Sequence, residues 1–287
     1  MTTLFSDFGM QVSSRLRAID EDARSGGLAR AIEVIADAIE GDGVLHAFGT
    51  GHSEAFAMEI AGRAGGFIPS HAIALRDLVL LGGRGDASIL VGAQLERDES
   101  IVDELYDLYE IHPADAFLIA SNSGVNGSVV GLALRAKTEG HPVIAVTSLE
   151  HSNAVQPKHP SGKRLSEVAD VVLDNRAPYG DATLDLGDGL GAGPVSSITA
   201  AYIAQLLTIG AAERIRAAGH LPPLYISANI PGGDEHNDAL ERRYGARIKP
   251  TGAPQPAAAR SVRGLGRHGH TTANNSDPGR QTSRIER

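Results

Sequence analysis

The chain has 287 residues, of which 42% are hydrophobic, and it contains neither cysteine nor tryptophan. Without cysteine it can form no disulfide, no thiolate metal site and no cysteine nucleophile. The formal net charge is −9, but residues 1–250 carry −13, because residues 251–287 hold six arginines against Asp277 and Glu286. An acidic main part argues against binding of nucleic acid, which needs a basic surface, whereas a local nest of amides can still bind a small anion.

Two further absences concern the location of the protein. No apolar run approaches the roughly 20 residues that span a bilayer. The first residues lack the basic flank and apolar core of a signal peptide. The sequence therefore predicts a cytoplasmic protein without a membrane or nucleic-acid partner.

Two amphipathic helices are expected at the start of the chain, because apolar residues recur there at three- and four-residue steps. The first covers residues 3–24 and ends at Ser25-Gly26-Gly27. The second runs from about Leu28 to Glu40. Residues 1–41 are therefore predicted to be N-terminal helices ahead of the first strand.

The next stretch has the pattern of a buried strand, a glycine turn and a helix. Val44–Phe48 is the strand, Gly49-Thr50-Gly51 is the turn, and Ser53 stands at the N-cap of a helix that is expected to reach Gly62. The glycines let backbone N–H groups approach a ligand, and the helix N-terminus favours negative charge. A phosphate is the natural ligand of such a turn.

A second turn of this kind lies in the clearest strand–helix–strand alternation of the chain. Ala116–Ala120 is predicted as a strand, Ser121-Asn122-Ser123-Gly124 as the turn, Asn126–Gly140 as a helix and Pro142–Thr147 as a strand. Such a unit has parallel strands and a right-handed crossover. Other predicted elements are strands at 69–75 and 168–174 and a helix at 98–111, while residues 76–97 stay unassigned. Together they indicate an α/β fold with a doubly wound parallel sheet.

The C-terminal part begins with residues 175–194, which are predicted to be a glycine-rich loop. Its Asp181, Asp185 and Asp188 could hold a hard cation, although solvated carboxylates are the default interpretation. A long apolar helix over residues 195–218 is expected to be buried, in the core or in a subunit interface. Residues 251–287 are rich in Pro, Gly, Ser and Arg without periodicity, and are predicted to be disordered.

Several common nucleotide and hydrolase motifs do not fit this chain. A dinucleotide fingerprint needs a third glycine where Glu54 stands, and a carboxylate there would repel a pyrophosphate. The chain has no GxxxxGK[ST] loop and no GxSxG elbow. These absences disfavour a dinucleotide-binding protein, a P-loop nucleotide hydrolase and a serine hydrolase.

The two turns together, Gly49–Ser53 and Ser121–Asn126, resemble those of the SIS (sugar isomerase) family of phosphosugar-binding proteins. The strand and loop over Val143–Ser148 fit the same pattern, and the likeness covers about residues 28–215. The match looks closest to uncharacterised SIS proteins that are described as phosphoheptose isomerases. Three other segments share this likeness, namely Leu95-Glu96-Arg97, Thr147–Ser152 and Gly233–Asn237.

This resemblance implies a flavodoxin-like five-stranded parallel sheet, no cofactor, and a homodimer or homotetramer. Residues 1–250 would form one domain, with an SIS core at 43–215 and a C-terminal extension at 216–250. The phosphate would be held by hydroxyl groups and nearby amides, from Gly51, Ser53, Ser121, Asn122, Ser123 and Asn126. At Asn126 many SIS domains have Thr or Ser, so we expect this residue to cap its helix as well.

Glu59 is the candidate base, because its segment is similar to the one that carries the catalytic Glu of phosphoheptose isomerases. The alternative is a solvated carboxylate or an ion pair with Arg63 at i+4. The isomerases' second group, a His on the late helix, is absent from residues 195–218. His52 could replace it, as could Glu235 and His236, although the latter pair could equally be a surface turn with Asp234 as its N-cap.

The favoured function is a sugar-phosphate isomerase of the phosphoheptose or amino-sugar type, with Glu59 as base. The first alternative is a lyase similar to the SIS etherases that cleave the lactyl ether of N-acetylmuramic acid 6-phosphate. The second is a non-catalytic phosphosugar sensor that acts through another protein, because residues 1–40 offer no basic recognition helix.

Overall fold

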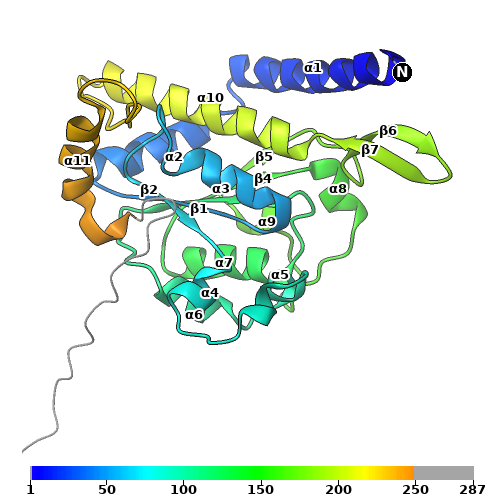
Figure 1. Ribbon diagram of the computed structural model, residues 1–287, viewed down its shortest axis with the longest axis horizontal. Coiled ribbons are helices and arrows are strands. Elements are labelled where there is room, and N and C mark those ends of the chain that lie inside the picture. Colours follow the sequence, from blue (N-terminus) through cyan, green and yellow to red (C-terminus); the bar gives the residue numbers. More distant parts are fainter. Residues whose placement is uncertain (1, 249–287) are drawn as a thin grey trace, which may run out of the picture. The chain divides into compact units, whose positions relative to one another are not determined.

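A five-stranded parallel sheet in the order β2-β1-β3-β4-β5 forms the centre of the computed structural model, which describes residues 2–248 (Figure 1). These residues belong to one compact unit. The strands are β1 (Leu45–Gly49), β2 (Ser70–Ile73), β3 (Ala116–Ala120), β4 (Val143–Thr147) and β5 (Val171–Asp174). The predicted fold class is therefore confirmed, including the number of strands in the main sheet. The predicted disordered tail, residues 251–287, lies outside the described residues.

Helices cover both faces of this sheet, and each face has its own hydrophobic core (Figure 1). Alternate residues of β3 show the division, because Leu118 packs into one core and Phe117 into the other. The first core is covered by α2 (Ala29–Glu40), α3 (Glu54–Ile60) and α10 (Ser196–Ala217), with α1 (Thr2–Arg24) at its margin. The second is covered by α4 (Asp77–Leu80), α5 (Gln94–Arg97), α6 (Val102–Asp107), α7 (Gly127–Thr138) and α9 (Leu165–Val168).

The predicted helices at the start of the chain and the long apolar helix near its end are confirmed as α1, α2 and α10. Burial of α10 is also confirmed, since Ala204, Leu207 and Ala211 are fully buried in the first core. Among the described helices, none has an apolar stretch long enough to cross a lipid bilayer.

Three expectations about local structure are wrong. The helix predicted over 98–111 is only the six-residue α6, and the strand predicted over 168–174 is shorter because α9 occupies its first residue. Residues 175–194 contain an antiparallel hairpin, β6 (Ala182–Gly187) and β7 (Leu190–Pro194). Its turn is Asp188-Gly189, and both residues have positive φ (52° and 76°), as a two-residue hairpin turn of this hand requires.

Four further elements complete this part of the description. One is η2 (Ala87–Leu90), which lies in the segment 76–97 that the sequence left unassigned, and the others are α8 (Leu149–Ala154), α11 (Gly233–Tyr244) and η3 (Gly245–Arg247). A third, smaller core joins α11 and η3 to the start of β1, through Val44, Ile68, Tyr244 and Ile248. The C-terminal extension therefore packs at the end of the sheet where the parallel strands begin, which we call the amino edge. The opposite end, which we call the carboxyl edge, is formed by the loops that follow β1, β3 and β5.

Candidate functional site

The loop after β1 folds back tightly on the start of α3. A Cβ atom on Gly49 would lie 2.1 Å from the carbonyl oxygen of Ser53, so only glycine allows this approach. A single 3₁₀ turn, η1 (Gly51–Ser53), then leads into α3. The prediction that Ser53 caps α3 is wrong for the side chain, because Ser53 already has helical φ and ψ and makes no cap bond. Its hydroxyl is therefore available to a ligand.

The loop after β3 is held by its own polar groups. Ser121 is buried, and its Oγ accepts a hydrogen bond of 3.1 Å from the N–H of Gly124. The Asn122 carbonyl accepts from the N–H of Ser148 at 3.2 Å. By contrast, the N–H groups of Asn122 and Ser123 donate to no acceptor within residues 2–248. This loop thus presents two unused backbone donors, which is what an anion site needs.

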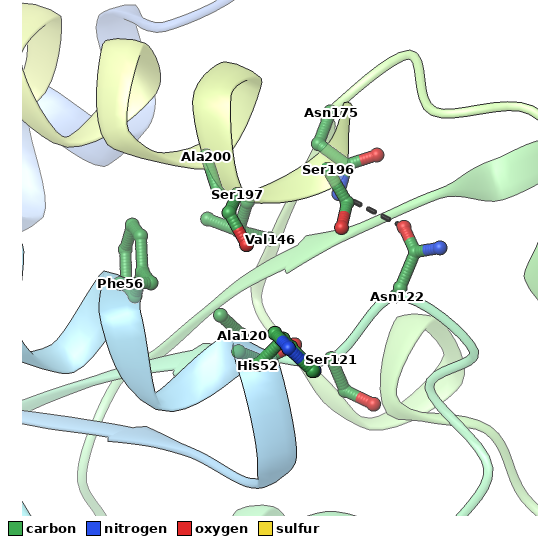
Figure 2. A pocket seen from close by; sticks show the side chains of 11 residues that line it. His52, Phe56, Ala120, Ser121, Asn122, Val146, Asn175, Ser196, Ser197 and Ala200 are labelled. Atoms are coloured by element: carbon green, nitrogen blue, oxygen red, sulfur yellow. Dashed lines mark hydrogen bonds between the residues drawn. The ribbon is translucent and has the colours of Figure 1, made fainter. Parts of the chain in front are cut away.

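A pocket brings these two loops together at the carboxyl edge of the sheet, and Figure 2 shows it from close by. In that view His52 lies across the pocket from Ser197, whereas the hydroxyl of Ser121 points away from Ser197. The side-chain amide of Asn175, just after β5, donates to Asn122 Oδ1 at 3.1 Å. We call this hollow the serine pocket, and its lining residues are His52, Ser53, Phe56, Ala120, Ser121, Asn122, Val146, Asn175, Ser196, Ser197 and Ala200.

The first turn of α10 enters the serine pocket because Asp181 fixes it. Asp181 Oδ1 accepts from the N–H groups of Val195 (3.0 Å) and Ser196 (2.8 Å), and its Oδ2 accepts from Ser196 Oγ at 2.6 Å. Asp185 instead accepts from the N–H of Gly187 within the hairpin. In the part of the chain that the structure describes, no cluster of His, Asp and Glu could hold a metal ion. Asp181 therefore caps α10 from 14 residues before Val195, and no local sequence pattern indicates such a contact.

The serine pocket is polar but carries no fixed positive charge. None of its lining residues is Lys or Arg, and its polar groups are hydroxyls, amides and one imidazole. Neutral donors of this kind, together with backbone N–H groups, can hold a phosphate dianion. At the start of α10, the N–H groups of Val195 and Ser196 already donate to Asp181. The loop after β3 is therefore the better source of backbone donors for an anion.

Glu59 lies one turn beyond Phe56 on α3, outside the lining of the serine pocket. Its Oε1 accepts from Gln205 Nε2 on α10 at 2.8 Å and also from the Arg63 guanidinium. The pairing with Arg63 is the one that helical spacing suggested. The sequence did not indicate a role for Gln205, although it is the one amide in an otherwise apolar stretch of α10.

Glu235 and His236 lie on α11, at the amino edge of the sheet, so one chain does not bring them to the serine pocket (Figure 1). His236 Nε2 is 2.9 Å from the carbonyl oxygen of Leu224. Asp234 is not the N-cap of α11, because Gly232 takes that position with φ of 81°. Glycine adopts this left-handed conformation without the steric cost that a Cβ atom brings.

Asn126 stands at the N-cap position of α7, as predicted, but it makes no cap bond. Its Nδ2 donates instead to the carboxylate of Glu96 on α5, and its buried Oδ1 has no partner within residues 2–248. The capping prediction is therefore wrong, because a long-range acceptor replaces the local one. Ser123 lies half-buried in the same loop as Ser121, outside the lining of the pocket.

Comparison with known proteins gives a family model and a set of relatives. The model described as the SIS domain matches residues 7–148. A UPF0309 protein of Listeria monocytogenes is 39% identical over 231 residues, which cover 79% of this chain and 92% of the relative. A UPF0309 protein of Halalkalibacterium halodurans is 33% identical over 245 residues, which cover 85% and 99%. The names of these relatives state no reaction.

Two solved structures are similar at low identity. A phosphoheptose isomerase, GmhA, from Neisseria gonorrhoeae is 19% identical with a TM-score of 0.45, covering 75% of this chain and 100% of that one. The Vibrio vulnificus NanR protein, solved in complex with ManNAc-6P, is 16% identical with a TM-score of 0.38, covering 82% and 66%.

Proposed function

The chain belongs to the UPF0309 family of SIS-domain proteins, and from this premise we propose that its serine pocket binds the phosphate group of a sugar phosphate. One observation carries the proposal. Ser53, Ser121 and Ser197 come from three separate segments and all line one pocket, which the loop with the unused N–H groups of Asn122 and Ser123 borders. Hydroxyl and amide donors that the fold itself does not need are what a dianion requires.

Titration calorimetry with inorganic phosphate and with fructose 6-phosphate tests the binding step. We expect Ser53→Ala and Ser197→Ala to weaken both ligands roughly tenfold or more each, because a hydrogen bond to a charged group contributes about 1.5–3 kcal/mol. Ser13→Ala, on the exposed face of α1, is the matched control and should bind as the wild type does. Equal affinity in all four proteins would contradict the proposal.

For the reaction, we propose an aldose–ketose isomerisation with Glu59 as the base. The carboxylate would take the proton from the carbon next to the carbonyl and return it to the neighbouring carbon, so that no atom is lost or gained. Gln205 and Arg63 support this role by fixing one carboxylate oxygen between α3 and α10. His52, exposed at the rim of the serine pocket, is the candidate to move the hydroxyl proton.

Glu235 and His236 enter this proposal only through a second copy of the chain, because their own serine pocket is at the other edge of the sheet. A homodimer or homotetramer is thus part of the proposal, as is a cytoplasmic location. Sedimentation of the purified protein, with and without fructose 6-phosphate, measures the oligomeric state directly.

Exchange of solvent deuterium into C1 or C2 of a panel of aldose and ketose phosphates tests the reaction. We expect Glu59→Gln to reduce exchange by a factor of about 10²–10⁴, as loss of a general base does, with binding of the sugar phosphate nearly unchanged. Glu213→Gln on α10 is the control with the same chemical change. If the wild type binds these esters without exchange, the isomerase proposal is wrong. Release of lactate from N-acetylmuramic acid 6-phosphate would then indicate a lyase, and its absence a sensor.

A further inference from the structure

A second and larger hollow lies on the other side of the turn that bounds the serine pocket. It has a free volume of about 310 Å³, against about 10 Å³ for the serine pocket. We call it the carboxylate cavity, and its walls include Thr50, Glu54, Leu75, Arg76, Ile89 and Glu96. Ser53 lines the serine pocket and the next residue, Glu54, lines the carboxylate cavity. The two hollows are therefore separated by one turn of the backbone.

Thr50 is the clearest sign that this cavity receives a polar ligand. The residue is only 7% exposed, and it stands at the N-cap of η1 without making a cap bond. Its hydroxyl donates to and accepts from no group within residues 2–248. The hydroxyl is not sealed from solvent and the residue lines the cavity, so a ligand there can form a hydrogen bond with it.

The walls of the carboxylate cavity carry more negative than positive charge. Glu54 forms an ion pair with the guanidinium of Arg76, so these two charges compensate each other. Glu96 has no cationic partner in the described part of the chain, and only the Asn126 amide binds its Oε1. Its Oε2 lies 3.5 Å from where a Cβ of residue 51 would be, so it faces the turn between the two hollows. One carboxylate therefore remains uncompensated in the cavity.

Glu96 is also held rigidly, which a binding group requires. The Asn126 amide fixes its carboxylate, and Ser128 Oγ donates to its backbone carbonyl at 2.8 Å. Both partners belong to the start of α7, next to the loop that presents the phosphate donors. The position of Glu96 is thus tied to the same segment that is proposed to bind the phosphate.

We propose that the carboxylate cavity binds the hydroxyl-rich body of a sugar monophosphate, with Thr50 and Glu96 as hydrogen-bond partners of its hydroxyls. This inference rests on the proposed phosphate role of the serine pocket. A sugar hydroxyl donates to a carboxylate, and its C–H groups suit the apolar walls of Leu75 and Ile89. A second phosphate would meet the uncompensated charge of Glu96, so the site selects against sugar bisphosphates.

The test compares affinities for inorganic phosphate, fructose 6-phosphate and fructose 1,6-bisphosphate by calorimetry on the full chain. In the wild type, fructose 6-phosphate should bind at least tenfold more tightly than either of the others. Thr50→Val and Glu96→Gln should each reduce the advantage over inorganic phosphate by about three- to tenfold, without changing affinity for inorganic phosphate itself. Glu96→Gln should also reduce the difference in affinity between fructose 6-phosphate and fructose 1,6-bisphosphate. Glu99→Gln, an exposed change of equal charge on the same segment, should change nothing.

Thermal unfolding adds a readout that a merely structural role would not give. Thr50→Val should unfold at about the same temperature as the wild type, because the hydroxyl that it removes has no partner within residues 2–248, while it weakens binding of the sugar phosphate. A lower unfolding temperature with unchanged affinity ratios would overturn the inference.

The failure of this inference differs from failure of the proposed function. If Ser53→Ala weakens phosphate binding but Thr50→Val and Glu96→Gln leave the ratios of affinity among the three ligands unchanged, only the inference about the carboxylate cavity is wrong. If inorganic phosphate binds equally well after Ser53→Ala and Ser197→Ala, the proposed function is wrong and the inference falls with it.

Discussion

The two edges of the central sheet use their polar groups in opposite ways. At the amino edge, the fully buried Asp115 accepts hydrogen bonds from Val44 N–H (2.8 Å), His112 N–H (2.8 Å), His46 Nε2 (2.9 Å) and Arg247 Nη2 (2.6 Å). At the carboxyl edge, Ser53 and Thr50 make no cap bonds. The first edge gathers its donors on one buried carboxylate, although His46 Nδ1 and Arg247 Nε have no partner within residues 2–248, and the second leaves hydroxyls free at a pocket. Unused donors that border a pocket are therefore a better guide to the binding site than polarity itself.

Removal of the Asp115 carboxylate should have the largest effect. Asp115→Ala leaves several buried donors and the Arg247 charge without a partner, so we expect a loss of about 3–5 kcal/mol in the free energy of unfolding. Urea denaturation measures it, with Ser53→Ala as the control, which should stay within about 0.5 kcal/mol of the wild type. Similar losses in the two variants would contradict the comparison of the edges.

The pH dependence of stability should come from the amino edge. Burial lowers the pKa of His46 from its ordinary 6.5, although the bond to Asp115 opposes this shift. Burial opposes ionisation of Asp115, but hydrogen bonds from His46 and the N–H groups of His112 and Val44 outweigh it and lower that pKa.

The unfolded chain protonates His46 below about pH 6.5, whereas the folded chain keeps it neutral to lower pH. Stability should therefore fall as the pH drops below about 6.5, by up to about 1.4 kcal/mol per pH unit. Denaturation between pH 7.5 and 5 measures this slope. His46→Gln should flatten it, and His52→Gln, at the exposed rim of the serine pocket, should leave it unchanged.

Asp181 is the exception at the carboxyl edge, and it should give the smallest effect. Asp181→Asn keeps the shape of the side chain but removes its charge and an acceptor, so α10 should lose about 1 kcal/mol of capping. Because the same cap positions Ser197, affinity for inorganic phosphate should fall as well. Asp185→Asn, in the hairpin, is the control. A fall in stability with intact affinity would show that the first turn of α10 does not contribute to binding.

The sequence predicted well what depends on local patterns. Ala116–Ala120 and the helix and strand after it follow from the alternation of apolar runs with turn residues. The hairpin at 182–194 was missed because its glycines and aspartates look like a loop, although Asp188-Gly189 is a hairpin turn signal. Residues 76–97 contain only three short helical segments, too short for a periodic pattern to show.

The site was only half predictable, for a physical reason. The turns with Ser53 and Ser121 carry their glycines and hydroxyls in consecutive residues, so a pattern reveals them. Asn175, Ser197 and Gln205 reach the site through the fold, and Gln205 meets Glu59 across 146 residues of chain. Asn126 and Ser53 show the converse, since both stand at N-cap positions without capping. Long-range partners decide such cases.

The contact between Arg247 and Asp115 also sets a limit on how far the chain can be shortened. A chain that ends after Ile248 keeps the guanidinium on Asp115 and keeps Tyr244 and Ile248 in the small core against Val44. A chain cut before Tyr244 loses both, and it leaves a buried carboxylate without its counter-charge. Denaturation of two chains, one that ends after Ile248 and one that ends before Tyr244, should therefore show a clear loss of stability only between them, because the second cut removes contacts of the amino edge.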